Sequence, residues 1–433
     1  MARKTMFILS MVILILTFVW SCSDRESLMD TSDVTTGGIS PKNHVFFDEL
    51  LFQLRNQFQL IKIVVYMPRA SFPIHYGGSG ARELPLLLLL PPHGEDAYFY
   101  LNHGLKDLAD EMIFTGEIEP MYIATIPSDP AQAFGGYFYA GSSYPAGDYD
   151  ALIGSTLVDY ISEAWEYPSM DPSQRGIGGV GAGAYGAFRA ALIHPGAFSS
   201  ITVADGPLDF DGSPGHGNGL VDLMSYAVLN EQGGFASDSA FRADFDSLQS
   251  SPISRMFIGG ALAFSPHDTL LDYTVEAHTE PSPPYRQEVW ITINDTTRGT
   301  PGYVIQDSVT LITRLVTEDV RNFDFHLPFD HTGQPYQPIW DFWLDDNLEN
   351  IGTGNELDGV AMWFATSPET QHGFHDQTMS WVETLEGRGY APTVREYTGY
   401  SGNPATSHEY IHEMLREILK FHSDNFKANA SGN

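Results

Sequence analysis

The chain has 433 residues, of which 42% are hydrophobic and 18% are charged, so it can bury a large core and does not have the composition of a disordered protein. Its 55 acidic and 22 basic side chains give a net charge of −33, which repels phosphate backbones and argues against a nucleic-acid partner. We interpret this charge as a source of solubility rather than as a ligand-binding feature.

The first 42 residues predict export and attachment to a lipid. A short basic segment precedes an apolar stretch at 5–20, which is shorter than the roughly 20 residues of a membrane-spanning helix and suits a signal peptide. Cys22 is the only cysteine, and the segment that leads into it resembles the lipobox of bacterial lipoproteins. We therefore predict a signal peptide over residues 1–21, lipidation of Cys22, and a flexible polar tether over residues 22–42.

Two alternatives stay open for this N-terminus, namely an ordinary signal peptide followed by a chance cysteine, or an uncleaved membrane anchor. The lipid prediction places the protein in a bacterial cell envelope, at the outer membrane or the cell surface rather than in the cytoplasm. Because Cys22 has no second cysteine to pair with, no disulfide within the chain can stabilise the exported fold.

Strands and helices alternate in the next part of the chain. The run 84–90 is almost wholly apolar, which is typical of a central strand in a parallel sheet that is buried on both faces. Further strands are predicted at 60–68, 121–127 and 175–180, and helices at 101–114 and 149–165. This alternation predicts a parallel sheet with crossover helices on its faces.

The segment 209–322 breaks the alternation. It holds a glycine-rich loop and a proline-rich stretch, and the alternating polarity of residues 287–294 predicts an edge hairpin. We interpret the segment as a cap insertion over the carboxyl edge of the sheet, within one domain that covers residues 43–428. After it, the core is predicted to resume with a strand at 357–364 and helices at 374–387 and 409–421.

A sharp turn from a strand into a helix is predicted at 176–191, where glycines recur on both sides of Gly181. Small residues allow such a turn to be tight and let the helix pack closely on the strand. The residue at the turn has a strained backbone, which glycine adopts at little cost. The pattern is that of a nucleophile elbow, yet Gly181 has no side chain that could attack a substrate.

Several motifs resemble the esterase family of α/β hydrolases that includes the esterase D-like, feruloyl and acetylxylan-type esterases. Where the family's elbow reads Gly-x-Ser-x-Gly-Gly-Tyr-Gly-Ala, residues 179–187 read Gly-Val-Gly-Ala-Gly-Ala-Tyr-Gly-Ala. Residues 191–198 resemble the family's ALKHPDLF, residues 205–210 its SGALDF, and residues 92–94 its LHG. The resemblance covers about residues 61–421 and implies an α/β-hydrolase fold with a mostly parallel central sheet, helices on both faces and a cap.

The resemblance also implies roles for particular residues. Gly181 takes the position of the nucleophilic serine, and His408 matches the catalytic histidine that serves as general base. Glu369 falls nearest to the family's acid, although a solvated surface glutamate is an equal alternative. The backbone N–H groups of Ala182 and Glu95 correspond to the oxyanion hole.

The absence of a serine hydroxyl removes the group that would form an acyl-enzyme. We therefore predict a non-catalytic relative of the esterases that binds a small-molecule or polysaccharide-linked ester, or a protein partner, and that reaches the membrane through Cys22. One alternative is an active carboxylic ester hydrolase that uses His408 with water or an unrecognised nucleophile. Another is a structural envelope protein whose cleft is filled by its own side chains.

No cofactor and no metal site is expected. His216 lies in a glycine-rich loop without a partner at metal-ligand spacing, and the glycines of residues 176–183 lack the early strand–helix context of a dinucleotide site. Four nearby aromatic residues either line a pocket for a sugar or aryl group or pack in the core: Tyr137, Phe138, Tyr139 and Tyr144.

Overall fold

The computed structural model describes residues 44–54, 57–68, 83–128, 136, 138–140, 149–164, 168–212, 219–231, 233–234, 252–265, 272–279, 287–294, 303–308, 328–352, 354–369, 373–398 and 410–431. Every described residue belongs to the second of two compact units, Met1–Pro41 and Lys42–Asn433. The predicted signal peptide, Cys22 and the tether therefore lie outside the described residues. Within the described part of the chain, no helix is both long and apolar enough to cross a membrane.

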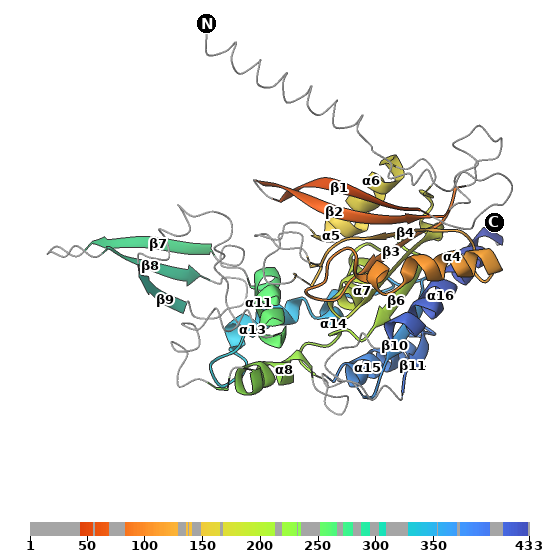
Figure 1. Ribbon diagram of the computed structural model, residues 1–433. Helices are drawn as coiled ribbons and strands as arrows, with labels where there is room; N and C mark the ends of the chain where they lie inside the picture. Colours follow the sequence, from red (N-terminus) through yellow and green to blue (C-terminus); the bar gives the residue numbers. More distant parts are fainter. Residues whose placement is uncertain are drawn as a thin grey trace, which may run out of the picture. The chain divides into compact units, whose positions relative to one another are not determined.

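An eight-stranded sheet forms the centre of the fold, with the strand order β1-β2-β4-β3-β5-β6-β10-β11 (Figure 1). Its strands are β1 (His44–Leu54), β2 (Gln57–Met67), β3 (Leu86–Leu90), β4 (Tyr122–Thr125), β5 (Arg175–Val180), β6 (Ser200–Ala204), β10 (Ala361–Thr366) and β11 (Thr393–Glu396). The pairs from β4 through β11 are parallel, whereas β1 pairs with β2, and β2 with β4, in the antiparallel sense. The predicted mostly parallel sheet is thus confirmed.

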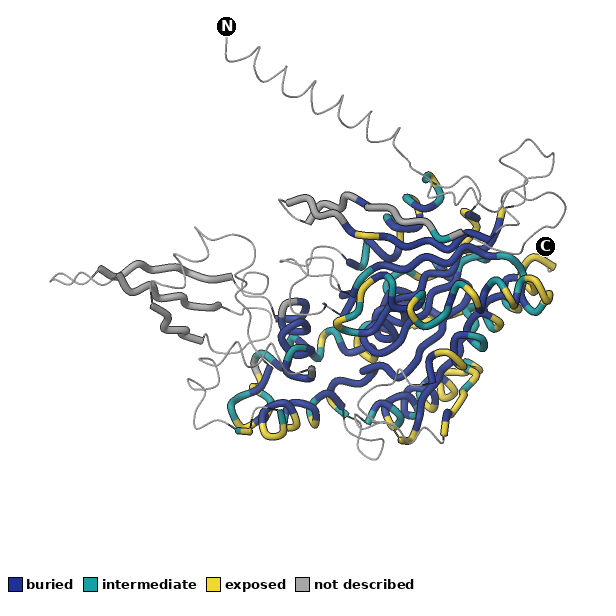
Figure 2. The backbone as a smooth tube through the Cα atoms, in the orientation of Figure 1, coloured by how far each residue is buried: buried dark blue, intermediate teal, exposed yellow. Residues whose placement is uncertain are grey.

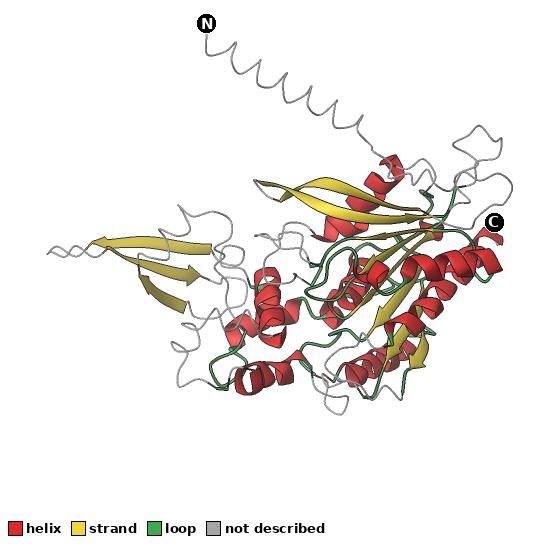
Figure 3. Ribbon diagram, viewed as in Figure 1, coloured by secondary structure: helices red, strands yellow, loops and turns green. Residues whose placement is uncertain are grey.

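Helices cover both faces of the sheet (Figure 3). They are α3 (Phe99–Asn102), α4 (Leu105–Thr115), α5 (Tyr149–Ala151), a π-helical turn (Leu152–Thr156), α6 (Leu157–Ala164), α7 (Ala182–Ile193), α8 (Leu220–Tyr226), a second π-helical turn (Ala227–Glu231), α11 (Pro252–Phe264), α13 (Gln337–Asp345), α14 (Leu348–Ile351), α15 (Phe374–Gly387) and α16 (Ile411–Ser431), with a short 3-10 turn at Pro172–Gln174.

The leucine run of β3 explains this layered arrangement. Leu86, Leu88 and Leu90 join one apolar cluster with α6 and α7, whereas Leu87 and Leu89 join a second cluster with α4 and α16. Alternate side chains of a strand point to opposite faces, so an uninterrupted apolar run is stable only where both faces are covered. Figure 2 shows the central strands buried along their length.

The segment 209–322 contributes helices that pack into the main core and a small second sheet. Aromatic side chains of α11 meet those of α13, with Phe264 and Trp343 ring centroids 5.0 Å apart. The strands β7 (Asp272–Thr279), β8 (Gln287–Asn294) and β9 (Tyr303–Ser308) form a three-stranded antiparallel sheet. The alternating segment is therefore a strand in antiparallel hairpins, as predicted, but it is the central strand of this small sheet and not an edge strand.

Candidate functional site

The chain turns from β5 into α7 at Gly181, and this turn is the centre of the candidate site. Gly181 has φ 58° and ψ −124°, a conformation that L-residues with side chains adopt only under strain. Its N–H group donates to the carbonyl oxygen of Ala204 at the end of β6, at 2.9 Å. Its own carbonyl oxygen accepts from the N–H groups of Ala184, at 3.0 Å, and Tyr185, at 3.3 Å, which starts the helix directly at the turn.

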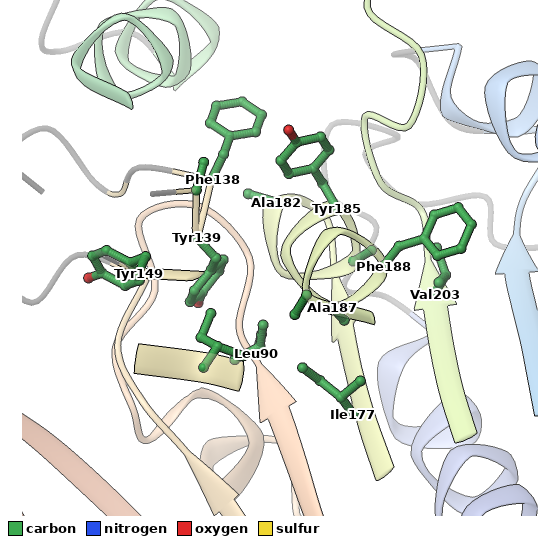
Figure 4. Close-up of a cluster of buried hydrophobic side chains, with 14 of the residues drawn as sticks. Leu90, Phe138, Tyr139, Tyr149, Ile177, Ala182, Tyr185, Ala187, Phe188 and Val203 are labelled. Atoms are coloured by element: carbon green, nitrogen blue, oxygen red, sulfur yellow. The ribbon is translucent and has the colours of Figure 1, made fainter. Parts of the chain in front are cut away.

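Glycines on either side of the turn allow the helix to lie against the sheet. A Cβ atom on Gly179 would lie 2.1 Å from the carbonyl oxygen of Gly183, and one on Gly183 would lie 2.0 Å from that of Leu90. Both distances are far below van der Waals contact, so only glycine fits. Figure 4 shows the result, in which Ala187 of α7 lies beside Leu90 of β3 and Ile177 of β5.

The loop after β3 approaches the turn from the other side. A Cβ atom built on Gly181 would lie 3.1 Å from the Cβ atom of Pro92, which is tighter than an ordinary carbon–carbon contact. Pro92 therefore borders the space that a side chain at position 181 would need. No hydroxyl, thiol or carboxylate extends from position 181 itself.

The two residues assigned to the oxyanion hole differ in their surroundings. Ala182 is the first residue of α7, and the leading N–H groups of a helix have no intrahelical acceptor. The N–H group of Glu95 donates to the carbonyl oxygen of Pro92 at 3.2 Å, so it closes a tight turn within its own loop. Burial, with a contribution from Asp96, raises the pKa of the Glu95 carboxyl group above its usual range. Both assignments stay predictions.

The remaining two assignments fall beyond the ends of later strands. Glu369 is exposed, three positions after β10 ends, and its N–H group donates to the Ser367 Oγ atom at 3.2 Å. His408 lies outside the described residues. The structure thus brings Gly181, Ala182 and the loop that contains Glu95 together, and it leaves the base and the acid as predictions.

A buried carboxyl group that the sequence analysis did not single out lies beside the turn. Asp205 directly follows β6, is 0% exposed and has a φ of 45°. Its carboxyl oxygens accept hydrogen bonds from the hydroxyl groups of Thr366, at 2.9 Å, and Tyr410. Burial raises its pKa to about 6, an effect that the hydrogen bonds from Tyr410, Thr366 and the Ser367 backbone oppose. The sequence does contain a feature that could have indicated this residue: Asp205 stands where the family's SGALDF motif has its serine.

The aromatic residues near the site are core residues where the structure describes them. Phe138 and Tyr139 are each 1% exposed, and the Tyr139 hydroxyl donates to the Pro91 carbonyl oxygen at 2.8 Å. Phe138 packs edge-on against Tyr185 of α7, with ring centroids 5.8 Å apart (Figure 4). These two side chains therefore pack in the core, and Tyr137 and Tyr144 lie outside the described residues.

Metal-ligating side chains are not grouped in the described ranges: no three of His, Cys, Asp and Glu there lie close enough to hold an ion. His375, at the start of α15, instead contacts two acidic side chains. Its Nδ1 atom lies 3.1 Å from Asp376 Oδ1, and its Nε2 atom lies 3.5 Å from Glu396 Oε2.

Comparison with known proteins finds solved structures whose fold is similar to that of this chain. No protein-family model and no curated protein matches the chain. The solved structure of a ferulic acid esterase matches with a TM-score of 0.50 and 14% identity, over 89% of this chain and 99% of the esterase. A fluorophosphonate-binding serine hydrolase of Staphylococcus aureus gives a TM-score of 0.44 and 12% identity, over 87% of this chain and 98% of the other. An S-formylglutathione hydrolase from Agrobacterium tumefaciens gives a TM-score of 0.44 and 11% identity, over 90% and 98%.

At 14% identity, the similarity to the ferulic acid esterase shows a common fold and does not show a common activity. The eight-stranded, mostly parallel sheet, the helices on its two faces and the sharp turn at Gly181 agree with that likeness. The chain therefore has the α/β-hydrolase fold of the esterases.

Proposed function

We propose that this chain is a lipid-anchored, non-catalytic protein that uses an esterase-like site to bind an ester-bearing small molecule, an ester-bearing polysaccharide or a protein partner. One observation carries the proposal. The turn at Gly181 keeps the strained backbone of an elbow, with φ 58° and ψ −124°, while its residue has no side chain and Pro92 borders the space that a side chain would enter.

The chemical reason lies in the nucleophile. Ester hydrolysis through an acyl-enzyme requires a hydroxyl or thiol group at the apex of the elbow, next to a general base. Removal of such a nucleophile lowers turnover by a factor on the order of 10⁶ and leaves on the order of 10³ over water, from binding and from the oxyanion hole. A site with Gly181 can therefore hold a carbonyl group without cleaving it efficiently.

Two features support retained binding. Ala182 is the first residue of α7, directly after Gly181, and the leading N–H groups of a helix favour a partially negative oxygen. The fold around them is closely packed, because Gly179 and Gly183 fix the distance between the helix and the sheet. This arrangement supports the proposal that the site binds an ester through its carbonyl oxygen.

The test compares ester hydrolysis by the chain from Ser23 onward in wild type and in three variants: Gly181→Ser, Gly181→Ser with Pro92→Gly, and His408→Ala. We expect no turnover of p-nitrophenyl and feruloyl esters by wild type. Gly181→Ser is expected to gain turnover, and more so with Pro92→Gly, because that change removes the Cβ atom that lies 3.1 Å from the new one.

Turnover by wild type that His408→Ala abolishes would contradict the proposal. It would establish the competing function, a carboxylic ester hydrolase in which His408 activates water or an unrecognised nucleophile. Absence of turnover in all variants, together with absence of ester binding by calorimetry, would favour a purely structural protein.

A further inference from the structure

Asp205 lies between two residues that touch the elbow. The preceding residue, Ala204, accepts the Gly181 N–H group at 2.9 Å. On the following residue, Gly206, a Cβ atom would lie 2.9 Å from the carbonyl oxygen of Gly181 and 2.7 Å from the Cβ atom of Ala184. The backbone on both sides of Asp205 is therefore packed directly against the turn.

The conformation of Asp205 has a cost that its surroundings must offset. A φ of 45° is unfavourable for a residue with a side chain, by roughly 1 kcal/mol or more, and is tolerated best by Asn and Asp. A carboxyl group that is 0% exposed also loses its hydration. Because the folded chain keeps Asp205 in this conformation, the hydrogen bonds that its carboxyl group accepts must offset both costs.

Those contacts join three elements at the carboxyl edge of the sheet. Thr366, the last residue of β10, donates its hydroxyl to Asp205 Oδ1 at 2.9 Å, and Tyr410, directly before α16, donates its hydroxyl to Oδ2. Tyr410 stacks on Tyr397, with ring centroids 4.7 Å apart, and the Tyr397 hydroxyl donates to Glu417 of α16 at 3.0 Å. In Figure 1, α16 runs beside β6 and β10.

We infer that Asp205 is the positioning carboxyl group of the elbow site, and that it acts through Tyr410 and Thr366 by fixing the start of α16 and the end of β10 beside the turn. This inference rests on the proposed function, because it concerns the same site. It gives Asp205 the place that the sequence pattern assigned to Glu369, which is exposed and has its N–H group bonded to Ser367 within its own turn.

The attachment of the start of α16 to Asp205 should depend on pH. The titratable groups that face Asp205 are Tyr410, from the start of α16, and His375, from α15. Burial nevertheless dominates and raises the pKa of Asp205 from 3.8 to about 6. This value belongs to the anchored form, in which Tyr410 donates its hydrogen bond to Asp205 and holds the start of α16. If α16 detaches at its start, Asp205 becomes hydrated and its pKa returns towards 3.8.

The anchored form therefore binds the proton more tightly than the detached form. By linkage, detachment becomes more frequent as the pH rises from about 4 through about 6, by at most about tenfold for each pH unit, and stays constant above that range. Asp205→Asn replaces the carboxyl group with a neutral group of the same shape. In this variant, the attachment of the start of α16 to residue 205 should not depend on pH.

The experiment measures hydrogen exchange at the first turns of α16, residues 411–415, where the Met414 N–H group donates to the Tyr410 carbonyl oxygen at 2.9 Å. In wild type, protection corrected for the intrinsic rate should fall as the pH rises from about 4 to about 6 and should stay constant above that range. Asp205→Asn should show a flat profile. Asp205→Ala should exchange at least about tenfold faster than Asp205→Asn, because it loses the hydrogen bonds outright. Glu386→Gln, an exposed change on α15, is the matched control.

A profile for Asp205→Asn that follows wild type, or equal exchange in Asp205→Ala and wild type, would overturn the inference. A second readout connects the anchor to the site: labelling of Gly181→Ser by a fluorophosphonate probe should slow about tenfold with Asp205→Ala and remain unchanged with Glu386→Gln. Labelling that is insensitive to Asp205→Ala despite faster exchange would reduce Asp205 to a structural residue, and sensitivity to Glu369→Gln instead would return the role to Glu369. If Gly181→Ser is never labelled while the exchange results are as expected, the proposed binding site at Gly181 is contradicted. The attachment of α16 through Asp205 is then still supported.

Discussion

At the scale of single residues, Gly181 and Pro92 depend on each other. A residue with a side chain at position 181 must adopt a φ of 58° and must also come within 3.1 Å of the Pro92 Cβ atom. The first cost comes from the backbone alone, and the second comes from the loop after β3. An elbow that carries serine must meet the first cost in any case, and the contact with Pro92 adds a second cost in this chain.

The two costs can be separated by mutation. Gly181→Ala should lower the free energy of unfolding by about 1–3 kcal/mol, and by less in a Pro92→Gly background, with a coupling energy of about 0.5–1.5 kcal/mol in urea unfolding. Gly196→Ala is the matched control, because Gly196 has a φ of 77° and no heavy atom within 4 Å of an added Cβ atom. If Gly181→Ala costs no more than Gly196→Ala, the contact with Pro92 does not matter.

At the scale of elements, α7 depends on its glycines rather than on its helix propensity. Gly183→Ala would place a methyl group 2.0 Å from the Leu90 carbonyl oxygen, so the helix must move away from β3. We expect a loss of about 3 kcal/mol or more in the free energy of unfolding, measured with urea. Gly387→Ala, at the end of α15 with no heavy atom within 4 Å of the added methyl group, should instead stabilise the protein by about 0.5–1 kcal/mol. Similar effects of the two changes would refute the packing argument.

The helix α16 is attached to β6 through a buried histidine. His422 is 0% exposed, its Nδ1 atom lies 2.7 Å from Ser200 Oγ, and its Nε2 atom lies 3.1 Å from Thr202 Oγ1. Burial lowers its pKa from 6.5 to about 3, so the folded protein keeps His422 neutral. Between about pH 3 and pH 6.5 the unfolded chain binds a proton at this residue that the folded protein does not bind.

The stabilisation by His422 is therefore fully present above pH 6.5 and declines as the pH falls towards 3. His422→Asn should be less stable than wild type at about pH 7, by roughly 1–2 kcal/mol, because it loses the fitted hydrogen bonds. The difference should shrink by up to about 1.4 kcal/mol for each pH unit below 6.5, as measured by urea unfolding at several pH values. A difference that stays constant with pH would show that His422 is not buried in its neutral form.

The elements that could be predicted from sequence are those with a local pattern. The strand β5 and the helix α15 begin and end where the pattern predicted, and the leucine run of β3 indicated burial on both faces. The strand β6 was not predicted, because Ser200 and Thr202 interrupt its apolar residues, and the partner of both is His422, more than 200 residues later in the chain. The turn at Gly181 followed from its glycines, whereas the role of Asp205 depends on Tyr410 and could not be found locally.

At the scale of the whole molecule, the net charge of −33 limits how the protein can reach a membrane. Anionic headgroups repel such a surface, and attraction to any other charged surface would be screened at high salt. The described part of the chain contributes no membrane-spanning helix. Our proposal of attachment through Cys22 rests on the lipobox-like segment before this cysteine, and it makes a prediction that separates it from both alternatives for the N-terminus.

The full chain, expressed in a bacterium, should sediment with membranes and stay there in about 1 M NaCl, where the Debye length is only about 3 Å. Cys22→Ser should appear in the soluble exported fraction, because it removes the lipid and leaves the folded unit, Lys42–Asn433, unchanged. Its thermal midpoint should equal that of the unit from residue 43 onward, which serves as the control. If Cys22→Ser still sediments with membranes, the apolar stretch 5–20 is an uncleaved anchor, since it would then hold the protein without a lipid. If wild type itself is soluble, the cysteine follows an ordinary signal peptide, and the site at Gly181 meets its ligand away from a membrane.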